Sequence, residues 1–154
     1  MREILFKGKR IDNGEWVEGC YYESKMSGVY ILEPYIEEIE EDGLIIYDDF
    51  NVYEVIPETV GQYTGLTDKN GVKIFEGDIV EYNDGYDYFK GEVTFENGAF
   101  GIGCDEIIGI SNGCSDNFEN LWQLFWNQEV TDEPMLYYCS VIGNIHDNPE
   151  LLER

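Results

Sequence analysis

Dipeptides of the Asn-Gly and Asp-Gly type recur along this sequence between runs of alternating apolar residues. They are Asn13-Gly14, Asp42-Gly43, Asn70-Gly71, Asp84-Gly85 and Asn97-Gly98. A type I′ hairpin turn needs a positive φ at both central residues, which glycine, asparagine and aspartate adopt most readily, so these dipeptides are the strongest short-range signal of a β-hairpin. The sequence therefore predicts an antiparallel meander or a small barrel built from short strands.

The residues beside these turns indicate which strands pair. The expected strands, in chain order, are 4–10 with 15–22, 30–40 with 44–55, 72–75, and 92–95 with 99–102. Each of the three pairs is joined by one turn dipeptide, and the strand at 72–75 follows Asn70-Gly71 directly. We therefore expect hairpins along most of the chain.

Helical signal is confined to two segments. The first holds five apolar residues at helical spacing, Phe118, Leu121, Trp122, Phe125 and Trp126. A candidate cap precedes them at Ser115 or Asp116, and although Leu121, Gln123 and Phe125 also fit a strand, we expect a short helix. The second segment begins at Asn148-Pro149, a capping residue before a proline at the first helical position, which predicts a final helical turn over 148–152.

The chain length fits one domain with room for a small annex. At 154 residues it can bury a sizeable core, and its 43% of hydrophobic and 15% of aromatic residues are typical of a folded protein. The weakest boundary lies near Pro57, before the glycine-rich stretch 61–65. We expect residues 1–56 to form an N-terminal β-hairpin annex and residues 57–154 to form a barrel domain that ends in a helical turn.

The net charge restricts the class of partner. Thirty-three acidic residues against nine basic ones give a formal charge of −24. Such a field repels phosphate backbones and anionic membrane surfaces, so direct binding of nucleic acid or lipid is disfavoured. A basic protein is the partner that this charge favours.

Cysteine usage and hydropathy predict a cytoplasmic protein. No apolar run reaches the roughly 18 residues of a membrane span, and the first residues contain no apolar signal core. The four cysteines, Cys20, Cys104, Cys114 and Cys139, are widely spaced and form no Cys-x-x-Cys pair. We expect free thiols in or near the core.

Patterns that would indicate an enzyme are incomplete. The segment 109–113 fits the Gly-x-Ser-x-Gly nucleophile elbow around Ser111, but an elbow needs a parallel α/β sheet, which a chain rich in hairpins does not supply. His146, the only histidine, lies beside Asp147 before the final helical turn, where a local hydrogen-bonding or surface role is expected. We therefore predict no catalytic residue and no enzymatic activity.

Metal and cofactor motifs are also incomplete. Nine residues separate Cys104 from Cys114 and six separate Cys139 from His146, which is not the spacing of structural zinc ligands. The segment 68–71 resembles the start of a calcium loop but lacks the glutamate at loop position 12. No phosphate-binding glycine motif is present, so no cofactor and no metal site are predicted.

Two groups of residues are candidates for a binding surface. The first consists of tyrosines around acids in one predicted hairpin: Tyr82, Asp84, Tyr86, Asp87 and Tyr88. Cross-strand packing is the alternative explanation for these aromatic residues. The second group is Glu38 and Glu40, which would lie on one face of a strand about 6.6 Å apart, close to two rises along a DNA strand, and so could imitate phosphates.

Several stretches resemble the YopX family of phage and prophage proteins. They are the opening 2–4 with Phe6, Gly8 and Lys9, the segments 61–71 and 74–80, Gly91-Glu92-Val93 with Phe95, and 141–152. The resemblance implies a barrel similar to the SH3 type over about residues 60–145 and a phage or prophage origin, and it carries over no catalytic residue. In the corner Glu76-Gly77-Asp78 glycine can take the bend, while the flanking carboxylates can accept turn amides.

Three hypotheses for function follow from these observations. The first is a non-enzymatic protein that binds a basic host or phage protein, with nucleic-acid mimicry as a special case. The second is a structural module in which an aromatic surface closes a homo-oligomer. The third, an enzyme with an unrecognised site, has the least support because no nucleophile, base and orienting partner converge on any motif.

Overall fold

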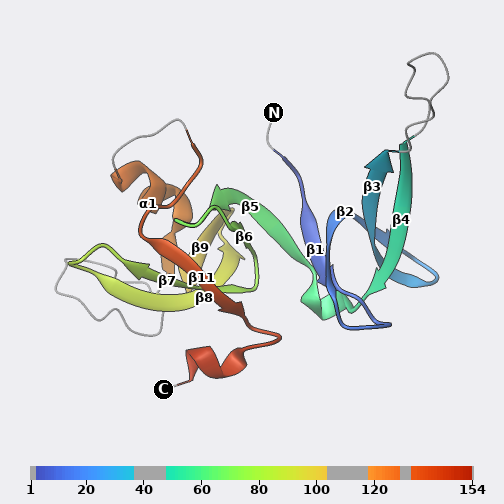
Figure 1. Cartoon of the computed structure of the whole chain (residues 1–154). Helices are drawn as coiled ribbons and strands as arrows, with labels where there is room; N and C mark the ends of the chain where they lie inside the picture. Colours follow the sequence, from blue (N-terminus) through green and yellow to red (C-terminus); the bar gives the residue numbers. More distant parts are fainter. Residues whose placement is uncertain (1–2, 37–47, 104–117, 129–132, 154) are drawn as a thin grey trace, which may run out of the picture. The chain divides into compact units, whose positions relative to one another are not determined.

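The computed structural model describes residues 3–36, 48–103, 118–128 and 133–153 (Figure 1). The strands are β1 (Phe6–Lys9), β2 (Trp16–Ser24), β3 (Gly28–Ile36), β4 (Asp48–Val55), β5 (Gly61–Thr67), β6 (Lys73–Phe75), β7 (Asp78–Asn83), β8 (Tyr88–Glu96), β9 (Ala99–Gly103), β10 (Phe118–Asn120) and β11 (Cys139–Asn144). The helical elements are η1 (Pro57–Thr59), α1 (Leu121–Asn127) and η2 (Pro149–Leu152). The predicted mostly β class is confirmed.

The strands form two antiparallel sheets. Their orders are β4-β3-β2-β1-β5-β6 and β10-β9-β8-β7-β11. The described residues contain no closed barrel, because β5 and β6 hydrogen-bond in the first sheet and leave β10 and β11 as the edges of the second. The chain divides into two compact units, residues 3–62 (unit 1) and 63–154 (unit 2), and the division falls inside β5.

Unit 1 has a small core on one face of its sheet. Val29 and Ile31 of β3 and Val55 of β4 are buried there, and Phe6, Val17 and Val60 pack against them. The strands approach closely at Gly19, where a Cβ atom would lie 2.1 Å from the carbonyl oxygen of Leu32. Because side chains alternate along a strand, the residues of β3 and β4 next to these buried ones point to the opposite face of this sheet.

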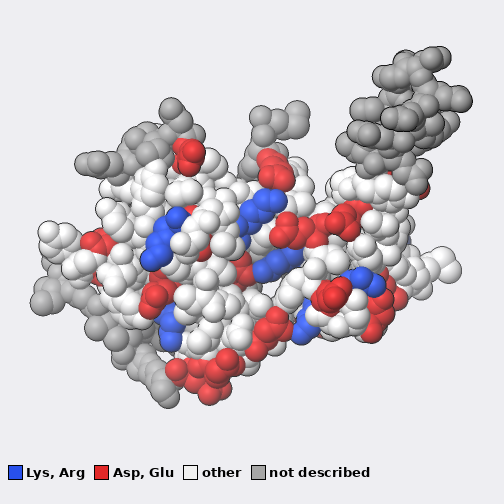
Figure 2. All heavy atoms as spheres, in the orientation of Figure 1, with Lys and Arg blue, Asp and Glu red and all other residues white. Residues whose placement is uncertain are grey.

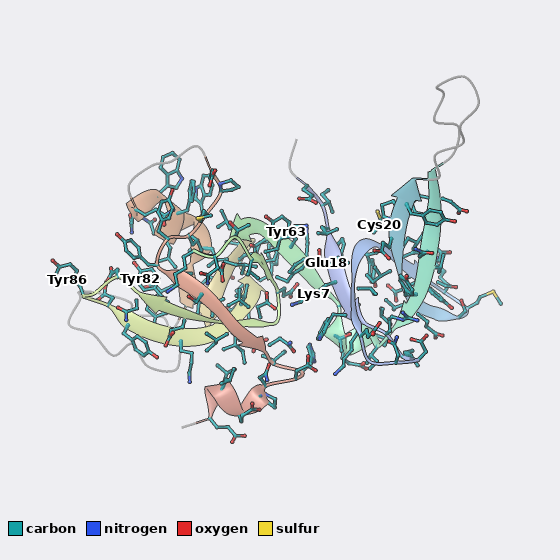
Figure 3. The ribbon with its side chains drawn as sticks, in the orientation of Figure 1. Lys7, Glu18, Cys20, Tyr63, Tyr82 and Tyr86 are labelled. Carbon is teal, nitrogen blue, oxygen red and sulfur yellow. The ribbon has the colours of Figure 1, made fainter. Side chains whose placement is uncertain are left out.

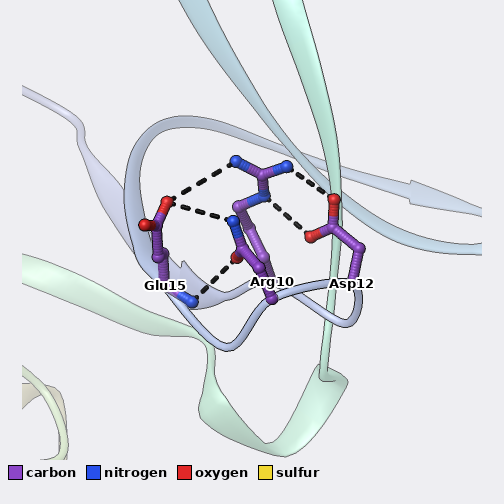
Figure 4. Close-up of polar contacts among 4 residues, drawn as sticks. Arg10, Asp12 and Glu15 are labelled. Carbon is purple, nitrogen blue, oxygen red and sulfur yellow. Dashed lines mark hydrogen bonds and ion pairs between the residues drawn. The ribbon is translucent and has the colours of Figure 1, made fainter.

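The β1–β2 turn of unit 1 is held by a polar cluster (Figure 4). Arg10 Nε and Nη2 donate to the two carboxylate oxygens of Asp12 at 2.9 and 2.5 Å, and Arg10 Nη1 lies 3.8 Å from Glu15 Oε2. Asn13 Oδ1 accepts the backbone amide of Glu15, and the Arg10 guanidinium lies 4.5 Å from the centre of the Tyr53 ring. The hydrogen bonds from Arg10 hold the pKa of Asp12 below its ordinary value. These contacts make the cluster a structural element of the turn.

Unit 2 contains the larger core. Its buried residues come from six strands, α1 and the segment before β11: Leu66, Ile74, Val80, Phe89, Val93, Ile102, Leu121, Leu136 and Cys139. Strands β7, β8 and β9 form consecutive hairpins, and β11 returns to pair with β7. At Gly91 a Cβ atom would lie 2.0 Å from the carbonyl oxygen of Gly103, so the strands approach here as closely as at Gly19.

The predicted corner at residues 76–78 forms as expected. Gly77 has a φ of 86°, a conformation that glycine adopts without steric cost. The buried Asp78 carboxylate accepts the backbone amide of Phe75 at 2.8 Å through Oδ2. Glycine therefore makes the bend and one flanking carboxylate satisfies a turn amide, as the sequence predicted.

The three strand pairs that the sequence predicted are confirmed, although their turns differ from the expected type: β1 pairs with β2, β3 with β4, and β8 with β9. Strand β5 also pairs with β6, and β7 with β8. Among the described turns only Asn97-Gly98 has a positive φ at both residues, 51° and 84°. At Asn13-Gly14, Asn70-Gly71 and Asp84-Gly85 only the glycine has a positive φ. Residues 42–43 lie outside the described residues.

Two helix predictions are confirmed and their caps are corrected. Helix α1 begins at Leu121, and its cap is Asn120, whose Oδ1 accepts the amides of Trp122 and Gln123, in place of the expected Ser115 or Asp116. Residues 118–120 form β10, because they pair with β9. The final turn is the 3-10 turn η2, and the side chain of Asn148 accepts the amide of Asn144 instead of capping it.

Candidate functional site

The first predicted surface, Tyr82, Asp84, Tyr86, Asp87 and Tyr88, lies on the β7–β8 hairpin of unit 2 (Figure 3). Oδ1 of Asp84 accepts the backbone amides of Tyr86 and Asp87 at 2.8 and 2.7 Å, and Oδ2 accepts the Tyr82 hydroxyl at 3.1 Å. The hydrogen bonds from these two amides lower the pKa of Asp84, although desolvation opposes them. Asp84 therefore stabilises its own turn.

The Tyr82 ring also packs against neighbouring aromatic rings. Its ring stacks on Phe89 at 4.7 Å between centroids and meets the edge of Tyr138. Burial, followed by the contact with Asp84, raises the pKa of the Tyr82 hydroxyl far above its ordinary value, so the hydroxyl remains a proton donor. The cross-strand packing alternative therefore describes Tyr82 correctly.

Only part of the predicted surface is presented to solvent. Tyr86 projects from the hairpin tip with 90% of its surface exposed, and Tyr88 donates its hydroxyl to Glu81 Oε1 at 2.6 Å (Figure 3). Asp87 is half-buried in the same turn. The other predicted pair, Glu38 and Glu40, lies outside the described residues.

Unit 2 contains a half-open groove. Its volume is about 460 Å³, and its lining comes from β5, the β8–β9 hairpin, α1 and the segment before β11. The lining residues are Thr64, Gly65, Leu66, Phe95, Gly98, Ala99, Phe100, Asn120, Leu121, Trp122, Phe125 and Pro134. None of them carries a charge.

Aromatic rings form most of the groove wall. Trp122 stacks on Phe125 at 5.6 Å between centroids, and Phe95 meets Phe100 edge to face at 4.9 Å. Trp122 is 59% exposed and Phe95 is 52% exposed. Large aromatic side chains left open to water in this way are typical of binding surfaces.

The polar groups of the lining already have partners inside the protein. The Thr64 hydroxyl donates to the carbonyl oxygen of Ile74 at 2.8 Å and accepts the amide of Leu66 at 3.2 Å. The Asn120 side chain caps α1. The groove therefore offers apolar contact and few hydrogen bonds.

Acidic residues adjoin three lining segments in the sequence. Glu96 follows Phe95, Glu119 precedes Asn120, and Glu133 precedes Pro134. The Glu96 carboxylate accepts the Thr94 hydroxyl at 3.3 Å, and because neighbouring strand residues point to opposite faces of a sheet, Glu96 lies on the other face from Phe95. The described basic residues of unit 2 are Lys69, Lys73 and Lys90, and none of them is a lining residue. On the face seen in Figure 2, basic side chains lie beside acidic ones.

Two described groups with catalytic potential, Cys139 and Asp68, are fully buried. Cys139 is fully buried, and desolvation followed by the nearby Asp68 raises the pKa of its thiol to about 12. Asp68 is also fully buried, with Oδ1 accepting the amides of Asn70 and Val72 and Oδ2 accepting that of Val141. This segment, which resembled a calcium loop, therefore uses both carboxylate oxygens as acceptors for backbone amides.

His146 lies in the turn after β11. Its backbone amide donates to Asn144 Oδ1 at 3.0 Å, and the backbone amide of Asp147 donates to the same oxygen.

No group of three metal-ligating side chains occurs within the described ranges. Ser111, Cys104 and Cys114 lie outside them. Among the described elements no helix is long and apolar enough to cross a membrane.

Unit 1 has an exposed apolar sheet face opposite its core. Cross-strand neighbours on this face are Tyr22 with Tyr30, Cys20 with Leu32, Leu32 with Val52, and Pro34 with Phe50. Tyr22, Phe50 and Val52 are among the exposed large hydrophobic residues, and Cys20 is exposed as well. Both described cysteines are free thiols, as predicted, but Cys20 is on the surface and only Cys139 is in the core.

Sequence reasoning located one wall of the groove and missed the rest. It singled out Leu121, Trp122 and Phe125 by their helical spacing and placed Phe95 and Phe100 in one predicted strand pair, but it assigned neither this pair nor the segment 64–66 to a binding site. Strand β5, the β8–β9 hairpin and α1 are far apart in the chain, and only the fold brings them to one groove. No local pattern marks such a site.

Comparison with known proteins gives one family and one fold. The family model described as YopX protein matches residues 5–153. The structure is similar to the crystal structure of protein EF1440 from Enterococcus faecalis, with a TM-score of 0.52 and 23% sequence identity over 99% of this chain and 100% of that chain. At this identity the likeness concerns the fold alone. No curated protein matches the chain.

Proposed function

The chain belongs to the YopX family, and from this premise we propose that it is a phage- or prophage-encoded, non-enzymatic protein that binds a basic partner protein through the groove of unit 2. The observation that carries the proposal is an aromatic, uncharged groove in a chain of formal charge −24. Aromatic anchors supply binding energy at protein interfaces, and the surrounding charge selects the partner and accelerates association.

The net charge supports the same class of partner. A molecule of formal charge −24 attracts a basic surface over several ångströms and repels an acidic one. Nucleic acid is therefore a poor ligand. Mimicry of nucleic acid through Glu38 and Glu40 stays a prediction, because both residues lie outside the described structure.

The described side chains favour binding over catalysis. The most buried candidates for chemistry, Asp68 and Cys139, are an amide-bonded carboxylate and a thiol of raised pKa, and neither lines the groove. A catalytic site needs a nucleophile or base beside a substrate cavity. The groove lacks such a group.

The experiment uses the whole chain as bait in a lysate of the host cell. We expect captured proteins to be basic, to be released when sodium chloride is raised from about 50 to about 500 mM, and to be lost with the Phe95→Ala/Trp122→Ala bait. The control bait is Tyr86→Ala, an exposed aromatic residue away from the groove. Capture of acidic proteins, or equal capture by the Phe95→Ala/Trp122→Ala bait, contradicts the proposal.

Self-association is a second candidate function, and the exposed sheet face of unit 1 favours it. Apolar residues on both faces of a sheet are typical of strands that are covered on both sides. If two copies pack through this face, Val52→Lys lowers the sedimentation coefficient to that of a monomer. In the same case, a thiol-reactive cross-linker joins two wild-type copies through Cys20 and does not join copies of the Cys20→Ser variant through this face. A wild-type chain that sediments as a monomer at all concentrations contradicts this candidate.

A further inference from the structure

We infer that the groove of unit 2 takes a short linear peptide segment in which one apolar side chain is flanked by lysine or arginine. The inference rests on the proposed function, and it narrows the partner from a basic protein to a basic segment with an apolar anchor. Three properties of the groove support it.

The first property is size. A volume of about 460 Å³ falls in the range of pockets that hold one small ligand, roughly 300–1,000 Å³. Such a space accommodates one or two side chains of a segment and not the broad face of a folded domain. The occupant is therefore a local stretch of chain.

The second property is the chemistry of the wall. The rings of Phe95, Trp122 and Phe125 offer apolar contact, and the Thr64 hydroxyl and Asn120 Oδ1 already bond within the protein. The polar groups of a nucleotide or a sugar that face this wall would lose hydrogen bonds to water without replacing them, which disfavours such a ligand. An aliphatic or aromatic side chain has no such cost.

The third property is charge. The chain carries a formal charge of −24, and Glu119 and Glu133 adjoin the lining residues Asn120 and Pro134 in the sequence, so a cationic flank meets a negative field. The exposed face of Trp122 can also accept a lysine or arginine by cation–π attraction. A segment with flanking glutamates would meet like charges and bind less well.

The experiment measures binding of synthetic fluorescent peptides to the full chain by anisotropy. The set has lysine or arginine flanks around a central Leu, Ile, Met, Phe, Trp, Tyr or Ser, together with glutamate-flanked copies of each. We expect at least one apolar centre to bind about tenfold more tightly than the serine peptide and its own glutamate-flanked copy. Equal binding of the serine peptide or of the glutamate copies, or no binding by any peptide, overturns the inference.

Variants of the chain locate the bound peptide. Trp122→Ala should weaken binding of the best peptide about tenfold, and Glu119→Gln/Glu133→Gln should weaken it severalfold and flatten its salt dependence. The matched control Glu58→Gln/Glu150→Gln removes the same charge from exposed positions outside the groove and should leave affinity within about twofold. Circular dichroism confirms folding of each variant, and an affinity unchanged by the folded Glu119→Gln/Glu133→Gln variant also overturns the inference.

Competition separates this inference from the proposed function. If a basic protein is captured through the groove but no peptide competes with it, the inference of a linear peptide ligand is wrong and the protein-binding function stands. If no basic protein is captured and no peptide binds, both are wrong.

Discussion

Asp68 Oδ2 accepts a hydrogen bond from the backbone amide of Val141 at 2.9 Å, across 73 residues of sequence. In the opposite direction, the amide of Lys69 donates to the carbonyl oxygen of Cys139 at 3.0 Å. The turn between β5 and β6 is thus fastened to β11 by two bonds. Asp68 Oδ1 meanwhile accepts the amides of Asn70 and Val72, so one buried carboxylate satisfies three backbone donors.

Removal of this carboxylate should destabilise unit 2. Asp68→Ala leaves the amides of Asn70, Val72 and Val141 without this acceptor, and because the first two residues are exposed to water we expect a loss of about 2 kcal/mol in the free energy of unfolding. Asp68→Asn keeps one oxygen and should lose less. Urea unfolding followed by tryptophan fluorescence measures the difference, with the exposed Glu58→Ala as a control that changes stability little. Equal stability of Asp68→Ala and Glu58→Ala would contradict the role of Asp68.

Glu92 should destabilise the folded protein at neutral pH. Burial, followed by repulsion from Glu76, raises the pKa of the Glu92 carboxyl. A raised pKa means that the folded state binds the proton more tightly than the unfolded chain, so stability is lost as the pH rises through this pKa. Glu92→Gln should therefore raise the melting temperature at pH 7 by about 2 °C. The gain should disappear below about pH 4, where the wild-type carboxyl is protonated.

Glu76→Gln is the second arm of this test. This substitution removes the repulsion between Glu76 and Glu92 but leaves Glu92 buried, so the pKa of Glu92 should fall only part of the way to its ordinary value. Nuclear magnetic resonance titration measures this pKa. A melting temperature that falls with Glu92→Gln at pH 7 would show that the carboxylate has a favourable partner.

The two described thiols should differ in reactivity. Cys20 is exposed, whereas Cys139 is fully buried with a pKa raised to about 12, and the thiolate is the reactive form. Iodoacetamide at pH 8 should label Cys20 much faster than Cys139 in the folded protein, and denaturant should bring the rates together. Peptide mass spectrometry measures each site. Fast labelling of Cys139 without denaturant would indicate that β11 separates from β7 under native conditions.

Salt should stabilise the free chain. At a formal charge of −24 the compact state suffers self-repulsion, and ionic strength shortens the Debye length to about 8 Å at 0.15 M. We expect the melting temperature to rise between about 20 and about 500 mM sodium chloride. Sodium sulfate at equal ionic strength separates screening, which predicts a similar rise, from surface exclusion, which predicts a larger one. A flat or falling trend would mean that the charges are already compensated.

The turns show why local sequence predicted the hairpins so well. Asn13 and Asp84 each precede a turn glycine and accept a backbone amide two residues further along the chain, and beside Asn70-Gly71 the same contact is made by Asp68. The dipeptides therefore marked the correct positions even where the turn was not the expected type. Only Asn97-Gly98, with exactly two residues between β8 and β9, adopts a positive φ at both positions.

Features that depend on packing escaped prediction. Helical spacing found α1 but not its start, because the pairing of Phe118–Asn120 with β9 turns the first predicted residues into a strand. Alternation in β3 did not reveal which face would be covered, since Val29-Tyr30-Ile31-Leu32 is apolar on both faces. The groove could not be predicted, because its walls meet only after β8, β9 and α1 have packed.

Gly19 and Gly91 limit how sequences of this fold can vary. A Cβ atom at either position would lie about 2 Å from a carbonyl oxygen of the neighbouring strand, at 2.1 Å for Gly19 and 2.0 Å for Gly91. Even alanine would force the backbones apart, whereas the acidic surface can change residue by residue at little cost. Among relatives that keep these strand pairings, we expect the two glycines to persist while surface charge drifts. Gly19 should therefore identify unit 1, and Gly91 unit 2, in the sequences of relatives, even where the partner that the protein binds has changed.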